Sequence, residues 1–298
     1  MKNGLFILLP LCIACSAATE PPPIREIARI AVSDIAEASG LAQSTLRPGR
    51  LWIVNDGGSP PVLHAIGTDG ASEGSLTLDP GTNVDWEAMA SFELDARSWL
   101  LVADTGDNEA ARVGGTIYVI EEPPLAGNED VIKPPDRTLS FRWPDGPQDC
   151  EAVSVDVASE RILLLSKRSI PAVLYELPLR PASDDVITAT RLGRVDSLPQ
   201  PTADDLARAA PERNWHWQPT AMDIAPDGRA AVILTYRAVY HFHRMNDEPW
   251  IEVLRKPTTV IDLAGIREAE AIAFVDQGVV LFTVEAPAAP LYRIEALR

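Results

Sequence analysis

The sequence predicts an all-β protein, a β-propeller with five blades. Two observations lead to this fold class. One short pattern occurs five times along the chain, and a spare strand before the first copy can complete the last blade. The apolar runs are short, rich in Val, Ile and Leu and separated by turn signals, which favours strands over helices. Repeats at this period are typical of propellers.

The repeated pattern is an apolar run that begins at a small or acidic residue, followed by a second apolar run that ends in a polar residue. The five copies align on Ser39, Glu87, Glu151, Thr220 and Glu270, which are 48, 64, 69 and 50 residues apart. A four-stranded blade takes about 40 to 50 residues. We therefore expect five blades, two of them with insertions. A sixth blade would require more strand within residues 184–217 than the pattern shows.

Further strands follow the two apolar runs of each copy. Third strands are expected at residues 62–66, 116–120, 173–177, 239–243 and 291–294. Blades one to four also have a candidate fourth strand, for example residues 138–142 and 250–254. The last blade ends after three strands, and residues 25–32 can supply its fourth. This closure removes an exposed sheet edge. Residues 204–210 have the pattern of a short helical insertion.

The N-terminus has the features of a secretory signal. Lys2 precedes an apolar run from Leu5 to Ala14, which is too short to span a bilayer, since a span needs about 20 residues. Cys15 ends a stretch that resembles a lipobox, so we expect it to be lipidated. Cleavage near Ala17 or Ala18, which would release a soluble secreted protein, is the alternative. The expected division is a signal peptide (1–15), a Pro-rich tether (16–24) and a single propeller domain (25–298).

The charge of the chain restricts its partners. It has 43 acidic and 26 basic side chains and a net charge of −17. Such a surface repels phosphate backbones and anionic lipids, which argues against nucleic acid and against membrane contact other than through the anchor. Cations and a small molecule or envelope ligand remain compatible. If Cys15 carries lipid, the expected location is the cell envelope, on its periplasmic or extracellular face. Cys150 is then the only cysteine outside the leader, so no intrachain disulfide framework is expected.

This topology predicts a group of carboxylates at one end of the central channel of the propeller, the mouth. The first strand of a blade starts at the face of the disc where the antiparallel second strand ends. The second strands are expected to end at Asp56, Asp104, Lys167, Arg237 and Glu285. Six of these ten starts and ends are carboxylates, and close carboxylates require a compensating cation. Oxygen ligands suit calcium.

We therefore expect a calcium site. Its predicted ligands are Glu87, Asp104, Glu151, Glu270 and Glu285. The alternative is an internal network in which Lys167 and Arg237 pair with the carboxylates and no metal is bound.

Other chemistry-bearing residues are few. Trp215, His216 and Trp217 precede the fourth inner strand in a loop expected at the same mouth. The two indoles, with Asp56, are candidate ligand contacts, although the tryptophans can equally anchor the insertion. The candidate catalytic residues are His216, Lys167 and Arg237. The sequence has no GxSxG, HExxH, GxGxxG or P-loop motif.

Several strings of the sequence are familiar as a set. LWIVNDGG (51–58), NVDWEAMA (83–90), ADTGDN (103–108) and TAMDIAPDG (220–228) resemble a family of exported bacterial propeller proteins that is grouped with TolB-like or NHL-type propellers. The resemblance implies a propeller and an envelope location, and no particular reaction. Ala221 departs from the glycine more usual there. The acidic mouth is similar in kind to that of calcium-bearing propeller hydrolases such as lactonases, paraoxonases and propeller phytases, which is an analogy of fold.

Two functions fit these observations. The first is an envelope binding module of unknown ligand with a calcium-binding mouth. The second is a calcium-dependent hydrolase of a lactone, ester or phosphoester. The first is preferred because the sequence has no evident nucleophile or dedicated base.

Overall fold

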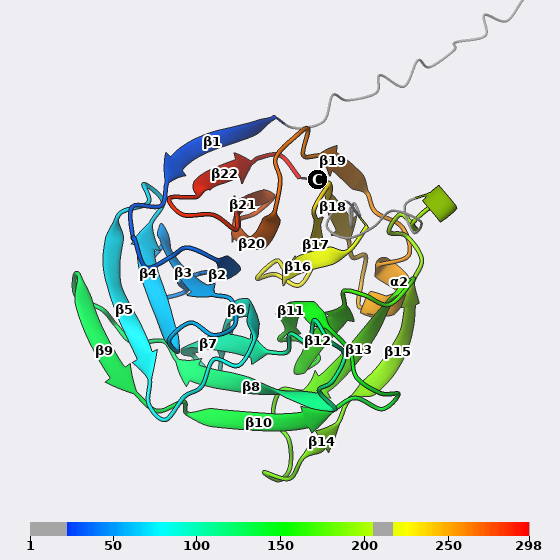
Figure 1. Ribbon diagram of the computed structural model, residues 1–298, viewed down its shortest axis with the longest axis horizontal. Coiled ribbons are helices and arrows are strands. Elements are labelled where there is room, and N and C mark those ends of the chain that lie inside the picture. The colour runs from blue at the N-terminus through cyan, green and yellow to red at the C-terminus, as the bar shows by residue number, and fades with distance from the viewer. Residues whose placement is uncertain (1–22, 205–216, 298) are drawn as a thin grey trace, which may run out of the picture.

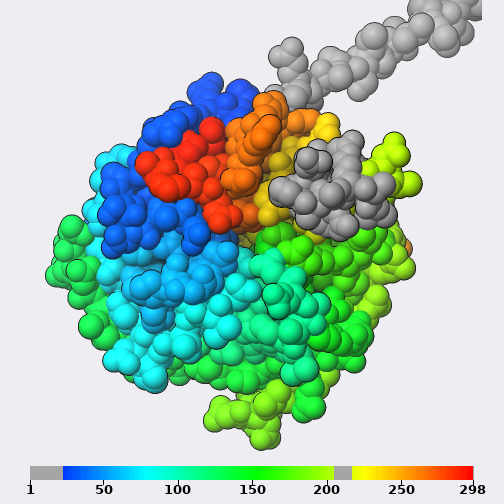
Figure 2. All heavy atoms as spheres, viewed as in Figure 1, coloured from blue at the N-terminus to red at the C-terminus, as the bar shows by residue number. Residues whose placement is uncertain are grey.

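Five β-sheets form a ring in the computed structural model, which describes residues 23–204 and 217–297 (Figure 1). Each sheet has a core of four antiparallel strands, and the sheets follow one another around the disc in chain order (Figure 2). The predicted five-bladed propeller is confirmed.

The first strand of each blade is the innermost. Blade one contains β2 (Ala38–Gln43), β3 (Arg50–Asn55), β4 (Val62–Gly67) and β5 (Ser72–Leu78). Blade two contains β6 (Trp86–Leu94), β7 (Arg97–Asp104), β8 (Gly114–Glu121) and β10 (Arg137–Arg142). Blade three contains β11 (Cys150–Asp156), β12 (Arg161–Ser166), β13 (Ala172–Pro178) and β15 (Thr190–Val195). Blade four contains β16 (Pro219–Ile224), β17 (Ala230–Thr235), β18 (Ala238–His243) and β19 (Thr259–Asp262).

The fifth blade joins the two ends of the described chain. It contains β20 (Ala269–Asp276), β21 (Val279–Val284), β22 (Pro290–Ile294) and the N-terminal β1 (Ile24–Arg29). β1 runs antiparallel to β22, with Ile24 opposite Ile294 and Arg29 opposite Pro290. The predicted closing strand is therefore confirmed, and it lies at the rim of the disc (Figure 1).

The two long repeats reach back to the preceding blade. β9 (Glu129–Lys133) leaves blade two and pairs in parallel with β5 of blade one. β14 (Ile187–Thr188) leaves blade three and pairs in parallel with β10 of blade two. These insertions add a fifth strand to blades one and two.

One expected strand is a helix. Residues 250–254 were predicted as the fourth strand of blade four, but α2 (Trp250–Val253) occupies them and β19 is the fourth strand. The apolar residues Trp250 and Val253 are three positions apart and both buried, which is the spacing of one helix face. Most of the helical insertion predicted at 204–210 lies outside the described residues.

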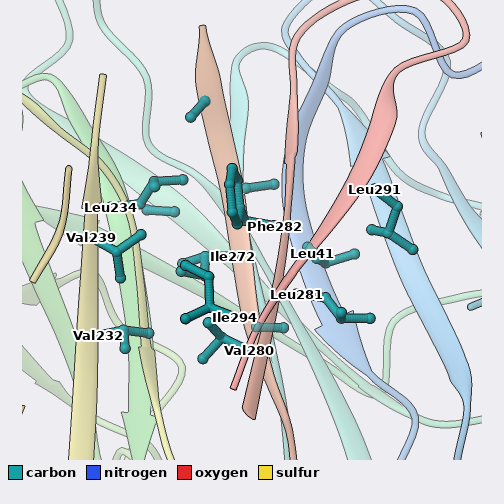
Figure 3. Close-up of a cluster of buried hydrophobic side chains, with 14 of the residues drawn as sticks. Leu41, Val232, Leu234, Val239, Ile272, Val280, Leu281, Phe282, Leu291 and Ile294 are labelled. Carbon is teal, nitrogen blue, oxygen red and sulfur yellow. The ribbon is translucent and has the colours of Figure 1, made fainter. Parts of the chain in front are cut away.

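Apolar clusters between neighbouring blades hold the ring together. In the cluster of Figure 3, Leu41 of β2, Ile272 of β20 and Leu234 of β17 belong to three successive blades. Complete burial of such a side chain stabilises the fold by about 1.5–3 kcal/mol. Within the described residues, no helix has the length and apolar character needed to cross a membrane.

A candidate cation site at the propeller mouth

The same backbone irregularity occurs at one end of every blade. At this end the pairing of the two innermost strands skips one residue in every blade, and the skipped residues are Ser39, Glu87, Glu151, Thr220 and Glu270. Blade five has a second shift at its other end, between Phe274 and Asp276. A β-bulge of this kind re-aims a side chain and is typical of the surroundings of active sites. These five residues are also the ones on which the sequence repeats align.

A cavity of about 190 Å³ lies at this end of the axis. It receives side chains from all five blades and is lined by Ala38, Ser39, Asp56, Glu87, Asn108, Glu151, Lys167, Arg168, Tyr236, Glu270 and Glu285. The inferred convergence of strand ends thus brings most of the predicted residues together.

Asp104 and Arg237 lie elsewhere, and the strand register explains why. In each blade the residue just before the bulge pairs with the last residue of the second strand, namely Asn55, Asp104, Ser166, Thr235 and Val284. The equivalent next positions are therefore Asp56, Thr105, Lys167, Tyr236 and Glu285. The predicted Asp104 and Arg237 are each one residue out of this register, and neighbouring residues of an extended chain point to opposite sides.

Both displaced residues have other partners. The Asp104 carboxylate accepts hydrogen bonds from the backbone N–H groups of Val84 and Asp85 and forms a 2.7 Å ion pair with Arg112. The exposed Arg237 lies 3.8 Å from Asp262. Neither residue lines the cavity.

Carboxylates gather on one side of the cavity, the acidic wall. Asp56, Glu87 and Glu151 line the cavity there, and Asp85 lies beside Asp56 and Glu87 without lining it. Asp56, Asp85 and Glu87 each offer an oxygen, and these atoms lie within 4.8 Å of one another. A second triplet under the same limit joins Glu87 to Asp149 and Glu151. Burial, reinforced by the charge of Glu151, raises the pKa of Glu87 well above its usual value. Burial and then Asp56 raise the pKa of Asp85 to about 6. These groups repel one another when ionised.

Two glycines allow loops to approach these carboxylates. A Cβ atom added to Gly57 would overlap Oδ1 of Asp85. A Cβ atom added to Gly106 would overlap both Oδ2 of Asp85 and Oε1 of Glu87. The backbone therefore encloses the Asp85 carboxylate from two sides without covering it with a side chain.

Glu151 has a buried oxygen without a partner. One of its oxygens accepts a hydrogen bond from Lys167 Nζ, whereas Oε2 has no hydrogen-bond partner among the described residues. An uncompensated buried carboxylate oxygen is costly. A proton or a bound cation would remove that cost. Burial raises the pKa of Glu151 well above its usual value, and Lys167 opposes this shift.

Blades three and four supply the other wall, the basic wall. Lys167 donates to Glu151 and, at 2.9 Å, to the Tyr236 hydroxyl. Burial disfavours the charged form of Lys167, but Glu151 and Glu270 outweigh it and raise its pKa. Arg168 donates through Nε to Asp149 at 2.5 Å and through Nη2 to Asn108.

The remaining predicted residues are not placed at the cavity. Trp217 is buried beside the start of β16 and does not line the cavity. Trp215, His216 and Cys15 lie outside the described residues. Tyr236 and Arg168 are not among the residues predicted from the sequence, although each is adjacent to a predicted one, Arg237 and Lys167.

The comparisons with known proteins leave the function open. No protein-family model matches the chain, and no curated protein matches it. Solved structures with a similar fold include a luciferin-regenerating enzyme (8% identity, TM-score 0.49, 93% of this chain and 96% of that chain). Another is a nidogen/laminin complex, with 12% identity, a TM-score of 0.44, and coverage of 84% of this chain and 73% of that chain. A third is the hydrazine synthase of Kuenenia stuttgartiensis, with 11% identity, a TM-score of 0.47, and coverage of 88% of this chain and 84% of that chain. Because these TM-scores are all below 0.5, the assignment of a propeller rests on the order of the strands in the five sheets.

Proposed function

We propose that the protein is an exported, lipid-anchored binding module of the cell envelope that holds a calcium ion at the mouth of its propeller. The observation that carries this proposal is the lack of compensation on the acidic wall. No described residue donates a hydrogen bond or forms an ion pair to the carboxylates of Asp85 and Glu87, and Glu151 Oε2 is buried without a partner.

The chemistry of the acidic wall selects the ion. Asp56, Asp85 and Glu87, with Glu151 beside them, offer only carboxylate oxygens. Calcium takes six to eight oxygen ligands in flexible geometry, whereas zinc sites normally include His or Cys. Glu270 and Glu285 add negative charge at the cavity. In this proposal Asp56 and Asp85 replace Asp104, Glu270 and Glu285 in the set of ligands that the sequence suggested.

A thermal melt with calcium or with excess EDTA tests the site. Saturation at about 100 times Kd stabilises a folded protein by about 2.7 kcal/mol, and for a domain of this size that corresponds to a shift of several degrees. We expect calcium to raise the Tm of a soluble form starting at Ala17, and the double variant Glu87→Gln, Glu151→Gln to lose that rise.

The matched control is Asp247→Asn, because Asp247 is an exposed carboxylate that does not line the cavity. This variant should keep the calcium response. Identical melts of the unmodified protein in calcium and in EDTA would refute the cation site.

The anchor has a separate test, because it rests on the leader sequence alone. We expect Cys15→Ser to move the protein from the membrane fraction to the soluble fraction of its host cells. A chain that stays soluble with Cys15 intact would be a secreted protein without an anchor.

Hydrolysis is the second candidate function, favoured by Lys167 and Arg168, which line the same cavity as the acidic wall. A bound cation polarises an ester, lactone or phosphoester oxygen, and basic side chains stabilise developing negative charge. Calcium-dependent turnover of such substrates, lost in Glu87→Gln, would establish the enzyme. Calcium binding without turnover across all three classes supports the binding module.

A further inference from the structure

The cavity has two chemically different walls, and only the acidic wall is explained by a cation. Lys167 is buried, while Arg168 has about a third of its side chain exposed at the rim. Both line the same cavity as Asp56 and Glu87. The basic side chains therefore face a space that the cation site borders.

The basic wall retains hydrogen-bond donors. The Lys167 ammonium has three N–H groups and uses two, to Glu151 and Tyr236. Arg168 uses Nε and Nη2, and its Nη1 has no partner among the described residues. An ammonium and a guanidinium with free N–H groups are the donors that bind carboxylate and phosphate oxygens.

The balance of acidic and basic side chains in the cavity determines when an oxyanion can bind there. Five carboxylates line the cavity against two basic side chains. An anion is repelled from that space until a divalent cation offsets the acidic wall. Anion binding is therefore coupled to cation binding, and each ligand must strengthen the other by the same factor.

The volume limits the ligand. A cavity of about 190 Å³ is smaller than the roughly 300–1,000 Å³ of pockets that hold a drug-sized ligand. After a cation has entered, the remaining space fits one small group. Any larger part of the ligand has to extend past Arg168 at the rim.

We propose that the mouth binds a compact oxyanion, a phosphate or carboxylate group, that bridges the bound calcium to Lys167 and Arg168. This proposal rests on the cation site proposed above, and it names the ligand class of the binding module.

Calorimetric titration of calcium, alone and with methyl phosphate or acetate present, tests the coupling. We expect at least one of these probes to tighten the apparent calcium affinity by about fivefold or more, within the usual range of coupling between sites. The probe with the larger effect identifies the preferred oxyanion. Neither probe should bind in EDTA.

Two arginine variants locate the effect. Arg168→Gln should keep calcium binding and lose the effect of the anion. Arg237→Gln should behave like the unmodified protein, because Arg237 lies near the same end of its blade but does not line the cavity. Equal coupling in both variants would overturn the role of Arg168. Tight calcium binding that neither probe alters would overturn the oxyanion site alone, whereas absence of calcium binding would overturn the cation site as well.

Discussion

The five bulge residues share a backbone geometry but do two kinds of work. Ser39 Oγ donates to the carbonyl of Trp86 in the next blade, and Thr220 Oγ1 donates to that of Ala269, both at 2.7 Å. These hydroxyl residues join the inner strands of neighbouring blades. The other three bulge residues, Glu87, Glu151 and Glu270, place carboxylates in the cavity, which Ser39 also lines. The same backbone irregularity therefore joins neighbouring blades at two positions and places carboxylates in the cavity at the other three.

Gly106 offers a test of the carboxylate geometry that leaves every charge in place. In Gly106→Ala the new methyl group must displace the carboxylates of both Asp85 and Glu87. We expect the calcium affinity to fall by about tenfold or more, equivalent to about 1.4 kcal/mol, with the fold retained. Calorimetry measures the affinity. Gly127→Ala is the control, because nothing lies within 4 Å of the added Cβ atom. Unchanged affinity in Gly106→Ala would place the ion elsewhere.

Asp223 is a buried carboxyl group outside the cavity lining, and it should make the stability of the fold depend on pH. Its carboxylate accepts hydrogen bonds from the N–H of Phe274 and from Ser154, so it connects three blades. Burial raises the pKa of Asp223 to about 7, although the hydrogen bonds oppose this. The folded state then holds a proton that the unfolded state releases near pH 4. The contribution of Asp223 to stability is consequently full below about pH 4 and is lost as the pH rises through about 7.

Urea unfolding of the unmodified protein and of Asp223→Asn, at several pH values in this window, measures the effect. The unmodified protein should lose stability relative to the variant as the pH rises, by at most about 1.4 kcal/mol per pH unit. A difference that stays constant across the window would contradict the shifted pKa.

At the scale of elements, the repeats were sufficient to predict five blades and the closing strand. Apolar runs of fixed spacing identify strands because one blade cannot bury its own faces. The error at residues 250–254 arose because a short apolar run fits a strand or a helix equally well. Only packing decides, and Trp250 is buried as part of a helix.

The site was predictable to within one residue. The carboxylates Glu87, Glu151 and Glu270 follow from the repeat itself. Tyr236 lines the cavity in place of the predicted Arg237. The strand register decides which of the two does so, because a shift of one residue exchanges the two faces of a strand. Arg168 reaches the cavity from a loop, and no periodic pattern specifies the conformation of a loop.

Two isoleucines of the N-terminal segment that closes the ring should contribute very differently to the free energy of unfolding. Ile30 is 1% exposed and belongs to the cluster that joins the last blade to the first, whereas Ile27 of β1 is 38% exposed. Ile30→Ala should lower the free energy of unfolding by about 2–5 kcal/mol. Ile27→Ala should change it by less than about 1 kcal/mol, since its side chain stays partly in water. Denaturant midpoints compare the two. Equal losses would show that the N-terminal segment does not seal the ring.

The whole molecule combines two kinds of negative charge that respond differently to salt. The net charge of −17 is spread over the chain and destabilises the compact state by general repulsion. Sodium chloride screens this repulsion, because the Debye length falls to about 8 Å at 0.15 M ionic strength. The carboxylates of the mouth are close together and mostly buried, so added salt screens them much less.

Thermal melts can therefore separate the two contributions. We expect the Tm to rise with the concentration of sodium chloride and to level off at about 0.15 M. Addition of calcium at about a hundredth of that concentration hardly changes the ionic strength, yet it should raise the Tm by several further degrees, because it binds the folded state only. Glu87→Gln should retain the first rise and lose the second. If magnesium and calcium at equal concentration gave the same second rise, and Glu87→Gln kept it, the divalent effect would be general screening, and the carboxylates of the mouth would form a scaffold without an ion.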